Sequence, residues 1–332
     1  MLLERLESLR HWVAAYLRSQ EFDLAPASSD ASFRRYFRVT FDGGNYIVMD
    51  APASHEDCRP FIKVARLLAE AGVHVPRVVA EDLGQGFLLL SDMGPVTYLS
   101  MLNESSAREL YLAANAALVK IQLASRRGEL PPYDRELLLR ELTLFPDWYV
   151  AKHLGQTLTD GQTHLLNQAF ERILANNLAQ PKVYVHRDYH SRNLMVSDPN
   201  PGILDFQDAV YGPITYDLAS LYKDAYISWE EEQVLDWVIR YWEAARKARL
   251  PVAADFYEFY RDFEWMGAQR HIKVLGIFAR LDHRDGKDAY LKDMPLVMDY
   301  LRRACKRYTE LHPMLRLLDQ LENRSAQVGY TF

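Results

Sequence analysis

The sequence predicts an α+β chain of two lobes, with a small antiparallel-β lobe first and a larger, mainly helical lobe after it. The chain has 332 residues, which is more than one hydrophobic core usually organises. Short strand-like runs separated by turn residues fill residues 20–91, and helical periodicity dominates beyond them, except between residues 183 and 214. We therefore expect a β-rich lobe with an N-terminal helix at residues 1–91, a hinge at 92–96 and a helical lobe at 97–332.

The elements of the first lobe follow from spacing and turn residues. Residues 1–20 place leucines near helical spacing among charges, which predicts an amphipathic helix. Residues 60–71 predict a second helix, because Pro60 stands in its first turn and Gly72 lies just past its end. Strands are expected where apolar residues alternate or run together between turns, at residues 33–41, 45–49, 78–81 and 87–90.

Composition excludes several classes of protein. Hydrophobic residues make up 49% and charged residues 25%, as in an ordinary globular enzyme, and the net charge of −6 argues against a nucleic-acid partner. No apolar run reaches the roughly 20 residues that a membrane helix needs, and the charged N-terminal segment is unlike a signal peptide. Cys58 and Cys305 are isolated, as expected of reduced thiols. We expect a cytoplasmic protein without a membrane partner; its oligomeric state has no sequence signal, and a monomer is the default.

The loop at residues 185–194 carries the clearest chemical signal. It reads V-H-R-D-Y-H-S-R-N-L and places Asp188 and Asn193 between short apolar runs, and Asp205 ends another such run. Magnesium-dependent phosphoryl transfer needs hard oxygen ligands on rigid elements. One carboxylate must orient the attacking hydroxyl and accept its proton, while an amide oxygen and a second carboxylate must hold the metal ion. The order Asp, Asn, Asp supplies one group for each task.

Each of these residues taken singly is typical of a solvated loop or a turn cap. The joint pattern, H-x-D-x-x-x-x-N followed by an apolar run that ends in D-F, is what predicts phosphoryl transfer. His186 is expected to brace the loop through a hydrogen bond, because Asp188 already fills the role of the base. His190 is expected to be structural as well.

The loop resembles the catalytic loop of protein kinases and, more closely, that of the aminoglycoside phosphotransferase and choline kinase superfamily. Members typically continue with I-x-D and then G-P-x-x-x-D-L-A, which stands here as G-P-I-T-Y-D-L-A at residues 212–219. The resemblance implies a protein-kinase-like bilobal fold and the cofactors ATP and Mg²⁺. It implies Asp188 as the catalytic base and Asn193 and Asp205 as the magnesium ligands. Asp217 would brace the catalytic loop, which is compatible with a helix N-cap.

The resemblance also suggests a nucleotide site, with one departure from the family. Main-chain groups of Ser91 and Met93, in the expected hinge, would meet the adenine edge. Most relatives carry a phosphate-gripping lysine on the third strand, but residues 46–50 read Y-I-V-M-D. Lys63 is spaced with other charges on a helix and is typical of a solvated face.

Other groups must then counter the phosphate charge. Small residues at 28–32, among them Ser29 and Ser32, would let backbone N–H groups approach a phosphate. Arg34 and Arg35 are both candidates to reach over it. Alternation along a strand puts them on opposite faces, and the sequence does not choose between them.

Three blocks resemble one bacterial subgroup in particular, the anomeric kinases of N-acetylmuramate and N-acetylglucosamine. They are D-A-S-F-R-R-Y-F-R from residue 30, M-D-A-P from residue 49 and D-F-Q-D-A-V-Y-G-P from residue 205. The resemblance implies a sugar 1-phosphate as product, in cell-wall recycling. Two alternatives stay open: a kinase of another small alcohol, such as an aminoglycoside, choline or homoserine, and a nucleotide-binding regulator without catalysis.

Charge gives a weak indication of the acceptor. Residues 270–303 hold eight Lys or Arg against five Asp, which suits a neutral or anionic acceptor better than a polycation. Arg270, His271 and Lys273 are candidates to meet a substrate carboxylate, although basic residues on a helix more often face water. Asp208 is a candidate to bind sugar hydroxyls.

Overall fold

The computed structural model describes residues 2–29 and 34–323, so Ser32 lies outside the described residues. The chain divides into two compact units. The N-terminal unit comprises Met1–Ile121 and Arg192–Ala209, and the C-terminal unit comprises Gln122–Ser191 and Val210–Phe332. The segment 192–209 therefore returns to the N-terminal unit from the middle of the chain. Whether residues 92–96 act as a hinge stays a prediction.

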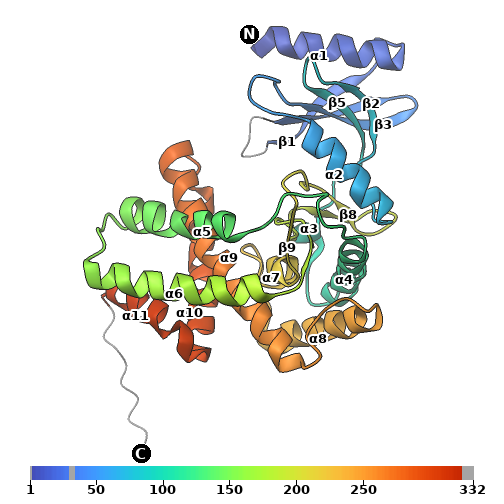
Figure 1. Cartoon of the computed structure of the whole chain (residues 1–332). Coiled ribbons are helices and arrows are strands. Elements are labelled where there is room, and N and C mark those ends of the chain that lie inside the picture. Colours follow the sequence, from blue (N-terminus) through green and yellow to red (C-terminus); the bar gives the residue numbers. More distant parts are fainter. Residues whose placement is uncertain (1, 30–33, 324–332) are drawn as a thin grey trace, which may run out of the picture. The chain divides into compact units, whose positions relative to one another are not determined.

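The N-terminal unit is built on a five-stranded antiparallel sheet (Figure 1), with strand order β1-β2-β3-β5-β4. The strands are β1 (Asp23–Ser29), β2 (Arg35–Phe41), β3 (Gly44–Asp50), β4 (Val78–Asp82) and β5 (Phe87–Ser91). The four expected strands are confirmed, although Phe33 lies outside the described residues. The sequence did not predict β1, which contains Pro26. Proline lacks an N–H donor and suits an edge strand, which is where β1 lies.

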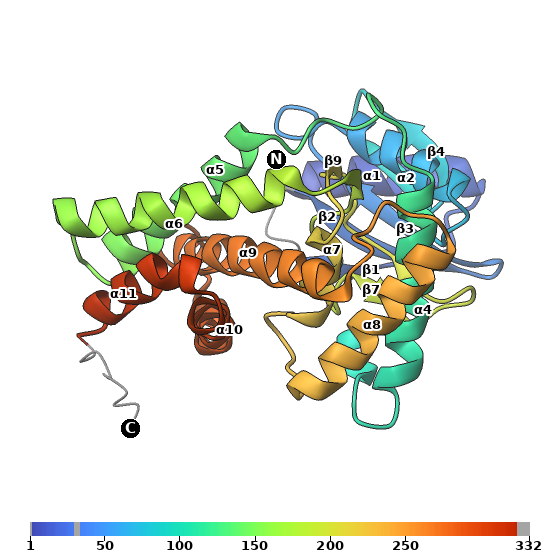
Figure 2. The same ribbon diagram turned by 60° about the horizontal axis from the view of Figure 1, so that its bottom comes forward.

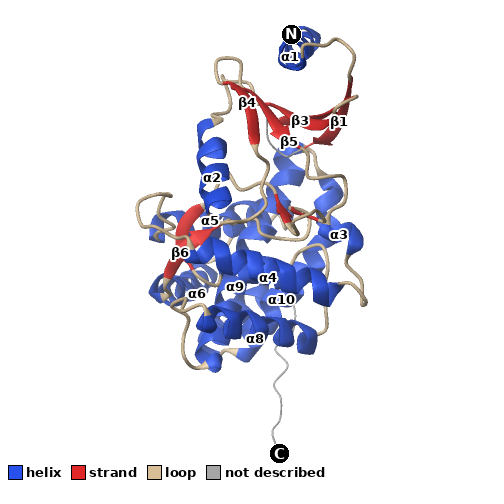
Figure 3. Cartoon of the chain, turned by 90° about the vertical axis from the view of Figure 1, so that its right-hand side faces the viewer, coloured by secondary structure: helices blue, strands red, loops and turns tan. Residues whose placement is uncertain are grey.

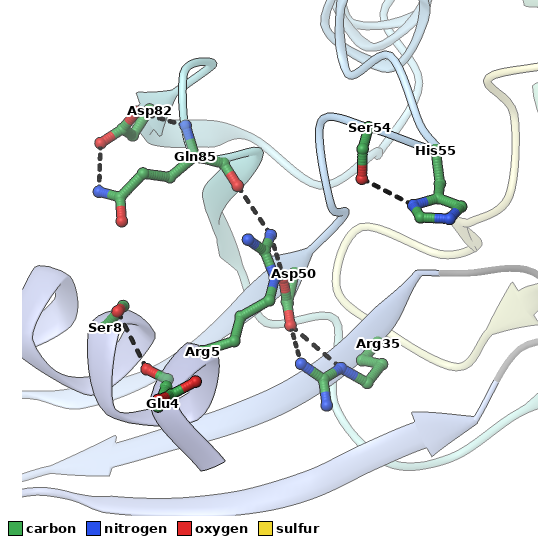
Figure 4. A network of polar contacts seen from close by, with 9 residues as sticks. All are labelled: Glu4, Arg5, Ser8, Arg35, Asp50, Ser54, His55, Asp82 and Gln85. Atoms are coloured by element: carbon green, nitrogen blue, oxygen red, sulfur yellow. Dashed lines mark hydrogen bonds and ion pairs between the residues drawn. The ribbon is translucent and has the colours of Figure 1, made fainter. Parts of the chain in front are cut away.

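Helix α1 (Leu2–Leu17) packs on one face of this sheet, as the amphipathic pattern predicted (Figure 1). The shared core consists of buried residues from the helix, from the segment before β1 and from the strands β2, β3 and β5: Leu9, Val13, Ala14, Phe22, Val39, Val48, Phe87 and Leu89. Alternation puts Arg35 of β2 and Asp50 of β3 on this same face, where they pair across the two strands. Asp50 is completely buried there and makes ion pairs with Arg35 and with Arg5 of α1 (Figure 4).

Helix α2 (Arg59–Glu70) lies between β3 and β4 in the sequence, and it begins and ends near the expected residues. Pro60 occupies its first turn, and Gly72 follows its end with a φ of 75°, a left-handed conformation that glycine adopts without strain. Two further helices complete this part of the chain, α3 (Tyr98–Met101) and α4 (Ala107–Leu123).

A short hairpin, β7 (Leu194–Met195) with β8 (Gly202–Ile203), belongs to the N-terminal unit. It is fixed there by bridges from Met195 to Thr97 and from Gly202 to His74. The two strands coincide with apolar runs in the sequence, and the loops around them hold two of the predicted site residues.

The C-terminal unit is organised around α9 (Phe256–Asp285), which packs against several other helices of this unit (Figure 2). Every residue from 263 to 276 is buried, so the middle of α9 has no solvent-facing side. Gly276 allows α9 to pass against the backbone of Leu144, because a Cβ atom there would lie 2.4 Å from the Leu144 carbonyl carbon. The expectation that basic side chains of this helix face water is wrong for Arg270 and Lys273.

The remaining elements of this unit are mostly helices (Figure 3). Strand β6 (Lys182–Val185) pairs with β9 (Val210–Pro213) in a small antiparallel sheet. The helices are α5 (Arg135–Leu144), η1 (Phe145–His153, a π-helix), α6 (Asp160–Ala179), α7 (Tyr216–Tyr222), α8 (Glu231–Lys247), η2 (Asp288–Asp293, 3₁₀), α10 (Met294–Arg307), η3 (Thr309–Leu311, 3₁₀) and α11 (His312–Leu321). Among the described residues, no helix is both long and apolar enough to cross a membrane.

Candidate active site

The loop that carries Asp188 follows β6, and hydrogen bonds to Asp217 of α7 fix its backbone conformation. Asp217 is 1% exposed, and its two carboxylate oxygens accept the backbone N–H groups of His186 (2.7 Å) and Arg187 (3.0 Å). Arg187 has a φ of 78°, which is uncommon for a residue with a side chain. Asp217 thus fixes a strained turn directly before the candidate base, as the resemblance implied.

Asp188 itself is held by its neighbours in the loop. Its backbone N–H donates to Nδ1 of His186 (3.2 Å), and its carbonyl oxygen accepts the N–H of His190 (3.0 Å). His186 therefore braces the loop, as expected. Burial opposes ionisation of the Asp188 carboxyl, but the positive charges of Lys273, Arg270 and Arg187 lower its pKa to about 2. The side chain is a carboxylate at neutral pH.

A buried acid on α5 neutralises two of these charges. Glu141 makes ion pairs with Arg187 and with Lys273, whose Nζ lies 3.1 Å from its carboxylate and also donates to the hydroxyl of Tyr216. Burial alone would raise the pKa of Glu141, but the charges of Lys273 and then Arg187 hold it below its usual value. Nothing in the sequence around Glu141 distinguished it from the surface acids of an amphipathic helix, so it was missed.

The three basic candidates on α9 differ sharply in their surroundings. Lys273 is engaged by Glu141 and Tyr216. Nε2 of His271 lies 3.2 Å from the carbonyl oxygen of Lys223, and the ring stacks on Tyr300. Burial lowers the pKa of His271 well below the ordinary value, so the ring is neutral. Arg270 is 4% exposed, and its Nη1 has no hydrogen-bond partner among the described residues. Of the three, Arg270 alone presents an unpaired charge.

Asn193 and Asp205 lie side by side in the N-terminal unit because the β7–β8 hairpin brings them together. Asn193 precedes β7, and its carbonyl accepts the N–H of Leu204, which follows β8 (2.9 Å). The amide nitrogen Nδ2 of Asn193 donates to one carboxylate oxygen of Asp205 at 3.4 Å. Nε2 of Gln207 donates to the other oxygen at 2.8 Å. The same Asn193 side chain carries an amide oxygen, and an amide oxygen together with a carboxylate is a set of hard donors that fits Mg²⁺.

Asp208 lies three residues beyond Asp205, in an exposed turn. Gln207 is its neighbour and lies between the two acids, 3.5 Å from Asp208. Phe206 is buried and packs on Phe61 of α2, with ring centroids 4.8 Å apart, so the turn is anchored to the N-terminal unit. A role for Asp208 in binding sugar hydroxyls stays a prediction.

The segment after β5 is fixed by an arginine that the sequence analysis did not single out. Arg38 of β2 makes two hydrogen bonds to the carboxylate of Asp92, at 2.6 and 3.1 Å. The N–H of Ser91 donates to the carbonyl of Arg77, so any adenine contact from Ser91 must come from its carbonyl oxygen. Met93 is buried and lies close to Gly202.

Arg35 and Arg34 lie in different surroundings. Both Nε and Nη2 of Arg35 donate to one oxygen of Asp50, and Arg5 donates to the other at 2.7 Å. Arg34 precedes β2, is partly exposed and lies within electrostatic reach of Cys58. Ser29 is the last residue of β1, but the structure does not describe its side chain. Ser32 lies outside the described residues. Arg35 is thus engaged by Asp50, and a phosphate contact from Arg34 stays a prediction.

Comparisons with known proteins agree with the motif and the fold. The model of the phosphotransferase enzyme family matches residues 23–257. An N-acetylmuramate/N-acetylglucosamine kinase of Neisseria meningitidis is 51% identical, covering 99% of this chain and 100% of the relative. A protein of the same name from Pseudomonas aeruginosa is 52% identical, covering 90% and 88%.

Solved structures share the fold at low sequence identity. The choline kinase of Streptococcus pneumoniae has a TM-score of 0.61 at 14% identity, covering 90% of this chain and 99% of that one. An ADP-bound aminoglycoside phosphotransferase has a TM-score of 0.60 at 14% identity, covering 88% and 97%. The predicted protein-kinase-like fold, with an antiparallel-β part and a larger helical part, is confirmed. With its family model matched over most of the chain and close relatives along nearly all of it, this protein belongs to the phosphotransferase enzyme family.

Proposed function

We propose that the protein is an ATP- and Mg²⁺-dependent sugar kinase that phosphorylates the anomeric hydroxyl of N-acetylmuramate and N-acetylglucosamine. The observation that carries the proposal is the braced, ionised Asp188 in a family of phosphotransferases whose relatives at 51% and 52% identity bear the name of this sugar kinase. The products would be sugar 1-phosphates, formed in the cytoplasm where ATP is supplied, for cell-wall recycling.

Asp188 is the base in this proposal. Its carboxylate accepts a hydrogen bond from the attacking hydroxyl and takes its proton as the sugar oxygen bonds to the γ-phosphorus and ADP leaves. A carboxylate with a pKa of about 2 is a weak base. It suits an anomeric hydroxyl, because that hydroxyl is more acidic than an ordinary alcohol. The weak basicity thus favours anomeric acceptors over simple alcohols.

Asn193 and Asp205 would hold the magnesium ion, which when bound screens the charge of the transferred phosphate. Their side chains are neighbours at the ends of the β7–β8 hairpin, with Nδ2 of Asn193 3.4 Å from a carboxylate oxygen of Asp205, which supports this assignment. On the nucleotide side, Arg34 and the backbone near Ser29 and Ser32 would meet the phosphates in place of the missing lysine. The main chain near Ser91 and Met93 would meet the adenine.

The test is sugar-dependent release of ADP from ATP and Mg²⁺, with phosphorus NMR to locate the phosphate. We expect turnover with both sugars, phosphate on the anomeric oxygen, and loss of about 10³-fold or more in kcat for Asp188→Asn. The matched control is Asp236→Asn on α8, where the half-exposed carboxylate pairs only with Arg240 in the next turn; it should keep normal turnover.

Other outcomes separate the alternatives. Turnover with choline, homoserine or an aminoglycoside, but with neither sugar, would replace the sugar assignment by another small-alcohol kinase. ATP binding without turnover on any acceptor would indicate a regulator and would overturn the proposal.

A further inference from the structure

Arg270 is an unusual residue for the interior of a protein. It lies in the fully buried middle of α9, it is 4% exposed, and its Nη1 has no partner among the described residues. The guanidinium also makes no ion pair with any residue that the structure describes. A buried charge without a partner is strongly unfavourable, and buried charged groups are normally paired. A bound anion would supply the missing partner.

Three other buried acids of the C-terminal unit are engaged by groups other than Arg270. Glu141 pairs with Lys273 and Arg187. Asp217 accepts two backbone N–H groups of the catalytic loop. One oxygen of Asp224 accepts the N–H and hydroxyl of Ser191, and the other accepts the N–H of Tyr226 at 3.2 Å. Asp188 is the acid on which the charge of Arg270 acts, and no carboxylate of the described residues forms an ion pair with its guanidinium.

A second unsatisfied group lies in the same region. His190 follows Asp188 by two residues, is 8% exposed, and has no partner for its Nδ1. Burial lowers its pKa to about 4, so the ring is neutral and presents an imidazole nitrogen. The charge of Arg270 acts on both His190 and Asp188, which places the three groups within electrostatic reach of one another.

We propose that Arg270 binds the carboxylate of an anionic amino sugar beside Asp188, with His190 contacting a hydroxyl or amide group of the same sugar. The inference rests on the proposed function, since it takes Asp188 as the base that receives the acceptor. A planar guanidinium matches a carboxylate in charge and in geometry. Arg270 therefore favours acid-bearing sugars, such as N-acetylmuramate with its lactyl group, over neutral ones, and it disfavours polycationic acceptors.

The experiment compares Arg270→Met and Arg270→Lys with the wild type on three acceptors: N-acetylmuramate, its methyl ester and N-acetylglucosamine. For Arg270→Met we expect kcat/KM for N-acetylmuramate to fall about 10- to 100-fold more than for either neutral acceptor, mainly through KM. Arg270→Lys keeps the positive charge but lacks the planar guanidinium. Its kcat/KM for N-acetylmuramate should lie between the values for the wild type and for Arg270→Met. The wild type should prefer the acid to its ester, and Arg270→Met should lose that preference.

The matched control is Arg280→Met, which removes a partly buried arginine ten residues further along the same helix. It should leave the ratio between acid and neutral acceptors unchanged. Thermal unfolding distinguishes a ligand-binding role of Arg270 from a structural one. If Arg270 binds a carboxylate, it has no partner in the free protein, so Arg270→Met should not lower the melting temperature.

Two results would overturn the inference. One is an equal loss on all three acceptors together with a lowered melting temperature, which would make Arg270 a structural residue. The other is an unchanged preference for the acid in Arg270→Met. Failure of the proposed function looks different, because the wild type itself would then phosphorylate none of these sugars.

Discussion

Two buried acids near the catalytic loop have opposite electrostatic environments. Asp188 faces the positive charges of α9 and its pKa is lowered to about 2. For Asp217 burial dominates and raises the pKa to about 6, although His186 and the two backbone N–H donors oppose the shift. The acid that must act as a carboxylate stays ionised, while the acid that braces the loop takes up a proton in mildly acidic conditions.

The raised pKa of Asp217 predicts a pH dependence of stability. An acid with a raised pKa binds its proton more tightly in the folded state, so its contribution is complete below its unfolded pKa, near pH 4, and is lost as the pH rises to about 6. Between these values the free energy of unfolding of the wild type should fall by about 3 kcal/mol relative to Asp217→Asn. Urea denaturation of both proteins at pH 4, 5, 6 and 7 measures this. A difference that does not change with pH would contradict the assignment.

Asp205 offers a substitution that changes a proposed metal ligand without disturbing the backbone. Its φ is 60°, a conformation that Asn also tolerates. Asp205→Asn should therefore keep the melting temperature while abolishing the Mg²⁺ dependence of ATP binding, as measured by calorimetry with and without Mg²⁺. Asp205→Ala is the comparison, and the left-handed backbone should lower its stability by about 1–2 kcal/mol. Unchanged Mg²⁺ dependence in Asp205→Asn would exclude Asp205 as a ligand.

At the scale of an element, α1 is attached to the sheet by charge as well as by its apolar face. Arg5 of α1 donates to Asp50 and to the carbonyl of Gln85, so one side chain contacts the end of β3 and the turn between β4 and β5 (Figure 4). Because Asp50 is fully buried between Arg5 and Arg35, its carboxylate holds together two cations that would otherwise repel each other.

Removing the Asp50 carboxylate should weaken the attachment of α1 to the sheet. We expect Asp50→Asn to lower the free energy of unfolding by about 3 kcal/mol, because it leaves two arginines without their buried partner. Asp57→Asn is the control, since Asp57 is exposed and pairs with Arg59 two residues away; it should unfold as the wild type does. Urea denaturation monitors both. Equal stability of Asp50→Asn and the wild type would show that apolar packing alone holds α1.

The elements also show what the sequence was able to predict. Strands β2, β3, β4 and β5 follow from alternation and turn residues, which are local signals. Strand β1 was missed because Pro26 argues against a strand unless its edge position is already known. The middle of α9 was misjudged because a helix buried all round leaves no polar stripe, and its Glu, Arg and Lys residues resemble a solvated face.

The site divides in the same way. Asp188, Asn193 and Asp205 were found because their spacing lies within one short stretch of sequence. Glu141 and Arg38 were missed because their partners, Lys273 and Asp92, are distant in the sequence. No local sequence pattern predicts an ion pair between such distant residues.

At the scale of the whole molecule, the N-terminal unit is discontinuous. A fragment of residues 1–123 would lack the β7–β8 hairpin, whose bridges reach Thr97 and His74, and the ring of Phe206 that packs on Phe61. We expect this fragment to melt at a lower temperature than the same fragment joined to residues 192–209 by a flexible linker. Circular dichroism during heating measures both. Equal melting temperatures would contradict the assignment of 192–209 to the N-terminal unit.

This discontinuity constrains how the protein can be recombined with a relative. A chimera that exchanges only the first 121 residues would leave the hairpin that carries Asn193 and Asp205 attached to a foreign N-terminal segment. A second crossover on either side of residues 192–209 would keep the metal-binding pair with its own sheet. Laboratory recombination libraries of this family should therefore yield active members mainly when those eighteen residues are inherited together with the N-terminal segment.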